Sequence, residues 1–329
     1  MSALAPTIQA FFAQRLINQR HSSPHTISAY RDTIKLLIRF AAAHTGREPS
    51  LLDIADLNAT TIGAFLDHLE SERGNSARTR NARLAAIHSL FRYAAVRHPE
   101  HAQDIQRVLS IPPKRTDRAV VTFLDQEEVD ALLAAPDRST WTGRRDHALL
   151  LTAIQTGLRA SEIAALNVGD LQLDRSVHLT CIGKGRKQRI TPLTATTSAV
   201  LRVWLAERAG DLDDPVFPTI RGRRISRDAL ERRLTKHLQT AAQRRPSLED
   251  KNVTIHTLRH TAAMRLLQAG VDTTVIALWL GHERVETTRI YVHADLALKE
   301  RALARTKPPD TKPGRYRPPD TLLAFLEAL

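Results

Sequence analysis

The stretch from His256 to Tyr291 constrains the fold more than any other, because it divides into short helices with marked ends. The first helix ends at Gly270, and glycine adopts the left-handed conformation of a helix C-cap at little cost. Asp272 can then cap a second apolar helix, which ends at Gly281. The apolar face of the first helix consists of Leu258, Ala262, Leu266 and Ala269. The pattern predicts short helices packed together in a mainly helical domain.

Several polar side chains leave the ends of these helices and can converge on one spot. Arg259, His256 and His282 are donors suited to phosphate oxygens, and the phenol of Tyr291 can act as a nucleophile. His260 follows Arg259 directly and belongs to the same group. Taken alone, each histidine is more often a helix cap or a solvated residue, and a lone tyrosine is more often a half-buried core residue. Together they predict a phosphoryl-transfer site.

Two further basic residues lie upstream at predicted turns. Gly157 allows a tight turn before Arg159, and Glu162 can orient the guanidinium of that arginine. Residues 177–193 alternate around Gly183-Lys184-Gly185 and predict a β-hairpin with Lys184 at its exposed tip. A surface arginine on a helix–helix turn and a solvated hairpin lysine are the alternative explanations.

The 329-residue chain is strongly basic, since 48 Lys and Arg against 35 Asp and Glu give a formal net charge of +13. This excess predicts a polyanionic partner, with nucleic acid as the first candidate and a membrane surface as the second. The basic residues are spread through both halves without a long amphipathic segment, which favours nucleic acid. Cys181 is the only cysteine, and neither a signal peptide nor a bilayer-spanning apolar run is present. We therefore expect a cytoplasmic protein without a disulfide.

The first 105 residues predict an N-terminal domain of four helices. Amphipathic segments begin near residues 8, 24, 62 and 76. The fourth carries Arg78, Arg80 and Arg83 in its opening turns. These arginines indicate either a solvated face or a helix laid against a DNA backbone.

The helical pattern lapses from residue 106 to 121, where Ile111-Pro112-Pro113-Lys114-Arg115 combines a proline stop with positive charge. We predict a basic linker there, followed by a second domain over residues 122–304. Lys114 and Arg115 are candidate DNA contacts in the linker. Arg221, Arg223 and Arg224 precede a helix expected over residues 225–242 and form another candidate phosphate-binding cluster.

Five motifs, taken in order, resemble those of the tyrosine recombinase (phage integrase) family. They are Gly157-Leu-Arg159-Ala-Ser-Glu162, Gly183-Lys184-Gly185, His256-Thr-Leu-Arg259-His260, Leu280-Gly-His282 and Tyr291. The resemblance covers the second domain nearly throughout, and the N-terminal helices resemble the core-binding domain of that family on weaker motifs. It implies a mainly α fold with a small β-hairpin or sheet, in which a four-helix core-binding domain is joined to a mostly helical catalytic domain.

The resemblance also implies the chemistry. The catalytic residues would be Arg159, Lys184, His256, Arg259, His282 and Tyr291, with Glu162 and His260 in support. The two arginines would hold the non-bridging oxygens of a phosphodiester while Tyr291 attacks the phosphorus. His256 would accept the phenol proton, His282 would hydrogen-bond the phosphate, and Lys184 would protonate the departing 5′ oxygen. The 3′-phosphotyrosine keeps the bond energy, so neither a metal nor another cofactor is expected, and a 5′ hydroxyl of another strand would reverse the step.

Other functions stay open. A type IB topoisomerase uses the same residue types but would religate its own strand, and an accessory protein would bind DNA without cleaving it. A metal site built from His256, His260 and His282 lacks a carboxylate or cysteine cluster. Within the family, an Xer-type enzyme for dimer resolution and a mobile-element integrase or transposase share this size. Residues 256–304 are more similar to the mobile-element branch.

Residues 305–329 predict a tail that docks on another surface. Residues 307–319 are rich in proline and basic side chains, so they could extend roughly 40 Å. A short helix capped by Asp320 follows, and about two turns of helix need a partner. Its apolar stripe is Leu322, Phe325, Leu326 and Leu329. Docking within the chain and on a neighbouring subunit both fit. The resemblance favours the neighbour, in a homotetramer on double-stranded DNA or a heterotetramer with a sister recombinase.

Overall fold

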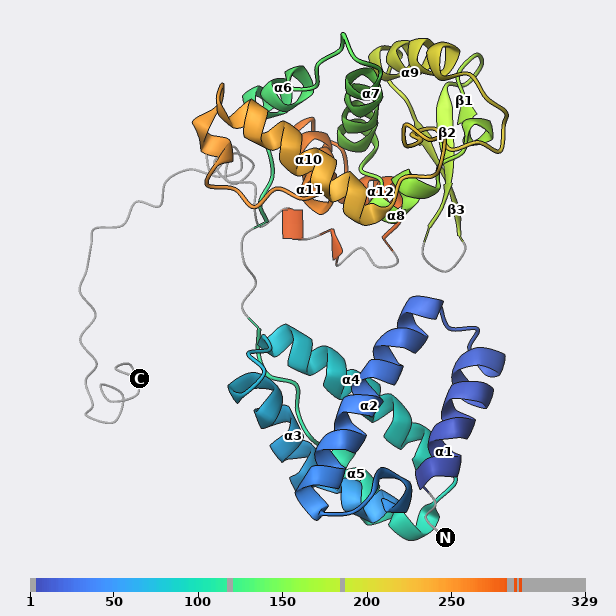
Figure 1. The fold of residues 1–329 in the computed structure, drawn as a ribbon, viewed down its shortest axis with the longest axis vertical. Coiled ribbons are helices and arrows are strands. Elements are labelled where there is room, and N and C mark those ends of the chain that lie inside the picture. The colour runs from blue at the N-terminus through green and yellow to red at the C-terminus, as the bar shows by residue number, and fades with distance from the viewer. Residues whose placement is uncertain (1–3, 117–120, 184–186, 283–286, 289, 292–329) are drawn as a thin grey trace, which may run out of the picture. The chain divides into compact units, whose positions relative to one another are not determined.

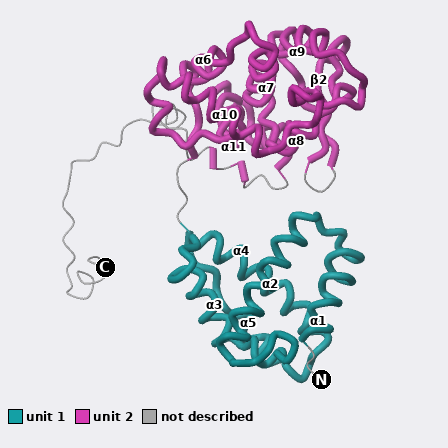
Figure 2. The backbone as a smooth tube through the Cα atoms, in the orientation of Figure 1, with its two compact units in different colours: residues 1–119 teal, residues 120–329 magenta. Residues whose placement is uncertain are grey.

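The computed structural model describes residues 4–116, 121–183, 187–282, 287–288 and 290–291. The chain divides into two compact units, residues 1–119 and residues 120–329 (Figure 2). Unit 1 is helical, and unit 2 is helical with one small sheet (Figure 1). The predicted mainly helical fold with a small sheet is therefore confirmed. No helix in the described ranges combines the length and the apolar character that a bilayer span requires.

The helices of unit 1 begin where the sequence supplies caps. Ser23, Asn58 and Ser76 each accept a hydrogen bond from the backbone N–H three residues further on. The helices are α1 (Leu4–Ala10), continued by a π-helix (Phe11–Gln19), α2 (Pro24–Thr45), α3 (Ala59–Ser71), α4 (Ala77–Ala95) and α5 (Ala102–Leu109), with 3₁₀ turns at Pro49–Leu51, Ile54–Leu57 and Pro99–His101.

The α5 helix was not predicted and lies partly in the segment that the sequence indicated as linker. Its Ile105 and Val108 are buried in the core of unit 1. The chain after α5 keeps to the same unit, because the backbone N–H of Lys114 donates to Asn81 Oδ1 at 3.0 Å. No side-chain cap marks the start of α5. The sequence signal for a helix is therefore weak there.

Unit 2 is arranged around α7, which packs against α9 and α11, while α10 packs against α6 (Figure 1). Its elements are α6 (Gln126–Ala134), α7 (Trp141–Thr156), α8 (Ala160–Ala165), β1 (Leu171–Gln172), β2 (His178–Ile182), β3 (Gln188–Pro192), α9 (Ala195–Arg208), α10 (Arg227–Ala242), α11 (Ile255–Gln268) and α12 (Thr273–Leu280), with 3₁₀ turns at Val168–Asp170 and Pro246–Leu248.

The sheet of unit 2 is antiparallel with strand order β1-β2-β3. Strands β2 and β3 are the predicted hairpin, with Thr180 opposite Ile190, and the short β1 adds an unpredicted edge. Leu179 and Cys181 point into the core of the unit. The hairpin is thereby fixed to the helices at its base, whereas Lys184 at its tip lies outside the described residues.

A buried ionic network fastens α7 to α10. The carboxylate of Asp146 accepts from Arg145 Nε and Nη2 at 2.9 and 2.6 Å, and His237 Nε2 lies 2.8 Å from its other oxygen. Burial alone would raise the pKa of Asp146, but the hydrogen bond from His237 and the charge of Arg145 hold this pKa below its usual value. A charged carboxylate is therefore part of the core.

Replacing Asp146 with Ala should lower the free energy of unfolding of unit 2 by about 3–5 kcal/mol, because Arg145 would stay buried without its partner. Asp130→Ala is the matched control, since Asp130 is an exposed aspartate on α6, and it should change stability by less than about 0.5 kcal/mol. Denaturant unfolding followed by tryptophan fluorescence measures unit 2 selectively, because Trp141, Trp204 and Trp279 all lie in it. A loss below about 1 kcal/mol for Asp146→Ala would contradict this role.

Candidate active site

The predicted site residues from α8, α11 and α12 come together in unit 2. The carbonyl oxygens at the end of α12 accept hydrogen bonds from the guanidiniums of Arg159 and Arg259. Arg259 is fully buried and donates from Nη1 to Gly157 O at 2.7 Å and from Nη2 to Leu280 O at 2.6 Å. Arg159 is 32% exposed and donates from Nη2 to Gly281 O at 3.2 Å. Burial lowers the pKa of Arg259 to about 10, so the guanidinium stays charged at neutral pH.

Two glycines make this close approach of helices and arginines possible. Gly157 and Gly281 both have φ of +65°, where a Cβ is strained. A Cβ on Gly157 would lie 2.7 Å from Leu280 Cδ2, and one on Gly281 would lie 2.5 Å from Arg189 Nη1. The turn before Arg159 and the end of α12 therefore both need glycine.

Arg189 on β3 belongs to this site, although it was not predicted from the sequence. Its Nη2 donates to Glu162 Oε2 at 2.9 Å and its Nη1 to Leu280 O at 2.9 Å. Glu162 in turn accepts from Arg159 Nη1 at 2.8 Å, as the sequence predicted for that carboxylate. The sequence carries no local signal for this role, because the strand buries its arginine and exposes its isoleucine. The Arg189 side chain is 9% exposed, whereas Ile190 is 63% exposed.

Tyr291 is buried, with 1% exposure, and its hydroxyl lies 3.0 Å from His260 Nδ1. Its ring stacks at 15° on the ring of His282, with the centroids 6.3 Å apart. Burial raises the pKa of Tyr291 to about 12, against the lowering effect of Arg259 and Arg159. Burial also lowers the pKa of His260 to about 4. Both groups are therefore neutral at pH 7, and one proton lies between them.

The other two histidines surround this pair. His282 Nδ1 lies 2.8 Å from Thr288 Oγ1, and burial, followed by the charge of Arg259, lowers the pKa of His282 to about 4. The ring of His256 lies 4.3 Å from that of His260 and reaches solvent. Partial desolvation and then Arg259 lower the pKa of His256. Among the described residues, His260 is the histidine that hydrogen-bonds the phenol, and His256 stands beside it.

The electrostatics of the site favour an anion. Glu162 pairs with the guanidiniums of Arg159 and Arg189, whereas Arg259 is held by backbone carbonyls, so three positive charges face one carboxylate. The pKa shifts leave the histidines uncharged at neutral pH. Burial would raise the pKa of Glu162, but the Arg159 N–H bond and the charge of Arg189 hold this pKa below its usual value. The site thus carries excess positive charge in partly desolvated surroundings, where charge-assisted hydrogen bonds are strongest. Within the described ranges, no group of three or more His, Cys, Asp or Glu side chains could hold a metal ion.

The basic residues predicted at the start of α4 have different surroundings. Arg78 is exposed. Arg80 is 6% exposed and lies 3.5 Å from Glu70 Oε2, which Lys114 Nζ also contacts at 2.6 Å. Arg83 is partly buried, and desolvation lowers its pKa. Of these four basic residues, Arg78 has the most accessible charge, whereas Arg80 and Lys114 are paired.

The remaining predicted contacts are exposed. Arg115 lies near the end of the described part of unit 1, and Arg221 and Arg223 border a shallow cavity before α10. Arg224 lines the same cavity but donates to Asn167 Oδ1 at 2.7 Å and to a backbone carbonyl. Arg221 and Arg223 therefore present the free charges of this cluster.

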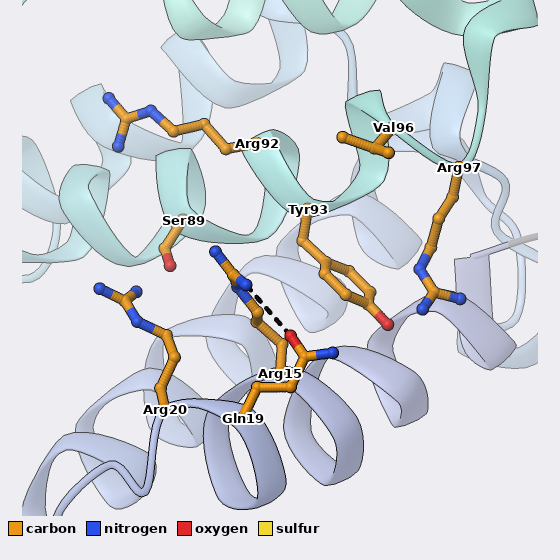
Figure 3. A pocket seen from close by; sticks show the side chains of 8 residues that line it. All are labelled: Arg15, Gln19, Arg20, Ser89, Arg92, Tyr93, Val96 and Arg97. Carbon is orange, nitrogen blue, oxygen red and sulfur yellow. Dashed lines mark hydrogen bonds between the residues drawn. The ribbon is translucent and has the colours of Figure 1, made fainter.

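A second basic pocket, in unit 1, was not predicted. It has a volume of about 450 Å³ and lies between the π-helix and the second half of α4 (Figure 3). It is lined by Arg15, Gln19, Arg20, Ser89, Arg92, Tyr93, Val96 and Arg97. Arg97 stacks on the ring of Tyr93 at 4.4 Å, and none of the four arginines forms an ion pair with another described residue. The two arginine pairs are some 75 residues apart in sequence, so only the fold brings them together.

Comparison with known proteins agrees with this geometry. The phage integrase family matches residues 122–297, and the family of its N-terminal SAM-like domain matches residues 8–98. A Sinorhizobium fredii protein named as an integrase/recombinase, y4rC, is 57% identical over 100% of this chain and 99% of its own length. Tyrosine recombinase XerC of Pelobacter propionicus is 32% identical over 90% of this chain and 93% of its own.

Solved structures show the same fold. A Tn1549 transposon integrase in complex with circular intermediate DNA matches with a TM-score of 0.67 at 15% identity, covering 91% of this chain and 99% of that one. The XerH recombinase in a post-cleavage complex with its difH substrate matches with a TM-score of 0.65 at 24% identity, covering 87% of this chain and 81% of that one. With these family matches and with relatives above 30% identity along most of its length, the chain belongs to the phage integrase family of tyrosine recombinases.

Proposed function

We propose that this chain is a site-specific DNA recombinase in which Tyr291 attacks a phosphodiester. The observation that carries the proposal is the placement of the phenol: it touches His260 and His282 and lies close enough to Arg159 and Arg259 for both charges to lower its pKa. A nucleophile, proton acceptors and charged donors for an anion are thus within one site.

The chemistry follows from these groups. The guanidiniums of Arg159 and Arg259 neutralise the non-bridging oxygens, which removes the repulsion that an attacking oxygen would meet. The phenol proton passes to the pair His256–His260, whose lowered pKa values keep both rings neutral and able to accept it. The bond from Tyr291 Oη to phosphorus forms while the bond from phosphorus to the 5′ oxygen breaks.

The departing 5′ oxygen needs a proton, which we assign to Lys184. This lysine lies outside the described residues, and the assignment rests on its place between Gly183 and Gly185 in the family motif. His282 would hydrogen-bond the phosphate. The 3′-phosphotyrosine stores the energy of the broken bond, so a 5′ hydroxyl from a second duplex can reverse the step and exchange strands.

The biological role is proposed from the relatives. The XerH and Tn1549 proteins are named in complexes with recombination-site and transposon DNA, which supports a double-stranded DNA site as the substrate. The 57% identity to an integrase/recombinase supports integration or excision of a mobile element, and the XerC relatives support dimer resolution as the alternative. We propose action in the cytoplasm as a tetramer of this chain or with a sister recombinase.

Replacing Tyr291 with Phe should abolish the covalent protein–DNA adduct and leave DNA binding intact, because only the attacking oxygen is removed. Tyr93→Phe is the matched control, since its hydroxyl bonds Gln14 in unit 1 and should not matter for cleavage. The measurement is an SDS-stable adduct on a duplex carrying the recombination site. That duplex is obtained by sequencing the DNA trapped on the wild-type protein in its host. An adduct formed by Tyr291→Phe would show that another residue attacks.

Lys184→Ala should slow cleavage by about 10²–10⁴, the usual range for a lost general acid. A bridging 5′-phosphorothiolate has a thiolate leaving group that needs no proton, so this substrate should be cleaved nearly normally by the variant. Lys187→Ala, which changes an exposed lysine of the same hairpin, is the control and should leave both rates unchanged. Equal defects of Lys184→Ala on both substrates would rule out the assignment.

Truncation after Lys312 should leave binding to one half-site intact and weaken assembly of the synaptic tetramer, because the predicted tail helix would be lost. The tail lies outside the described residues, so the prediction rests on its apolar stripe. Phe325→Ser should reproduce the effect, whereas Glu327→Gln, off the stripe, should not. Native gel analysis of complexes on DNA measures both steps. Tetramers formed by the truncated chain at wild-type concentrations would contradict trans docking.

A further inference from the structure

One carboxylate is shared by two guanidiniums from different elements. Glu162, whose side chain is 3% exposed, accepts from Arg159 Nη1 at 2.8 Å through one oxygen and from Arg189 Nη2 at 2.9 Å through the other. The second oxygen also accepts from the Arg159 backbone N–H at 2.8 Å. Arg189 therefore occupies a position on Glu162 that a bidentate pairing with Arg159 would otherwise use.

One carbonyl is shared in the same way. Leu280 O accepts from Arg259 Nη2 at 2.6 Å and from Arg189 Nη1 at 2.9 Å. Arg189 thus connects β3 to the carboxylate that orients the first site arginine and to the carbonyl that orients the second.

We propose that Arg189 is a positioning residue for cleavage, which fixes Arg159 and Arg259 at the separation where both guanidiniums reach one phosphate. This inference rests on the function proposed above and adds a residue to it. Arg189 contacts neither Tyr291 nor, by this proposal, the DNA. It acts through Glu162 and the end of α12.

Burying Arg189 costs the fold stability, which favours a functional role over simple packing. Its Nε is buried without a hydrogen-bond partner among the described residues, and its charge adds to those of Arg159 and Arg259. The neighbouring apolar residue Ile190 is exposed instead. A strand selected only for stability would bury the isoleucine and expose the arginine. Gly281 completes the arrangement, because a Cβ there would displace the Arg189 guanidinium. Arrangements that cost stability in this way are typical of functional sites.

Removing Arg189 would change the pairing of Arg159. With one oxygen of Glu162 released, the carboxylate can pair with both outer nitrogens of Arg159 and compete with the phosphate for them. Arg259 would lose a neighbour on Leu280 O but keep its bond to Gly157 O. We therefore expect a loss in the chemical step rather than in DNA binding, where many backbone contacts contribute.

The test uses full-length Arg189→Gln on the duplex recovered from the wild-type adduct. Single-turnover cleavage at saturating protein should slow on the order of 10–100-fold, as for other residues that orient reactive groups. The Kd for DNA should change less than about 3-fold. Arg189→Lys should resemble Gln, because an ammonium cannot bridge two acceptors in this geometry. A wild-type rate of cleavage by either Arg189→Gln or Arg189→Lys would overturn the proposal.

A substrate analogue separates positioning from damage to the fold. A methylphosphonate at the scissile position carries no charge, so the arginine pair has less to neutralise there and the defect of Arg189→Gln should shrink at least 5-fold relative to the phosphodiester. A bridging 5′-phosphorothiolate should show the full defect, because Arg189 does not act on the leaving group. Equal slowing on phosphodiester and methylphosphonate would overturn the proposal.

Two controls complete the design. Arg208 is a matched arginine of unit 2, with a side chain 7% exposed and 3.6 Å from Asp214, so Arg208→Gln should leave cleavage unchanged. In a Glu162→Gln background, Arg189→Gln should slow cleavage by less than it does in the wild-type protein, since part of its effect passes through that carboxylate, and full additivity would contradict this. Failure of the proposed function would appear separately, as a wild-type protein that forms no adduct or an adduct that survives Tyr291→Phe.

Discussion

The end of α12 is the point on which the catalytic unit depends. The last carbonyls of any α-helix lack partners within the helix, and they carry the negative end of its dipole. Here Leu280 O and Gly281 O receive guanidiniums from β3, from the turn before α8 and from α11. A helix end that would otherwise need water or a cap thereby holds three chain segments together.

The chemical nature of those partners matters as much as their number. Backbone carbonyls orient a guanidinium without cancelling its charge, whereas each carboxylate partner removes one positive charge from the site. With Glu162 as the shared carboxylate, Arg159, Arg189 and Arg259 keep an excess of positive charge while being held in place. Donors that are fixed before the substrate arrives need no reorganisation during reaction. Under the proposed function, the contacts that hold these arginines in the fold would also prepare them for a phosphate.

Much of this arrangement was predictable because it is local. Glycine after an apolar helix, a capping aspartate and a glycine-flanked hairpin are read from a few neighbouring residues, and α11, α12 and the β2–β3 hairpin formed as predicted. The partnership of Glu162 with Arg159 was likewise within reach, since three residues separate them. The order of the motifs then indicated the family, which the comparisons confirmed.

What the sequence did not predict depends on contacts between distant segments. The α5 helix has no capping residue and is stabilised by burying Ile105 and Val108, so its local signal is weak. Arg189 looks like a solvent-facing strand residue until Glu162, 27 residues earlier, is placed beside it. The pairing of Tyr291 with His260, rather than directly with His256, joins two residues 31 positions apart in the sequence. These are tertiary effects, which override local preference.

The hydrogen bond between Tyr291 and His260 has a consequence for the protein without DNA. A phenol with a pKa of about 12 is a poor nucleophile, and a histidine with a pKa of about 4 is a weak base for activating it. Tyr291 is also almost inaccessible to solvent. Under the proposed function, the protein without DNA would therefore hold its nucleophile as a neutral, buried phenol. The timing of strand breakage would then depend on how an arriving phosphate changes the surroundings of that oxygen.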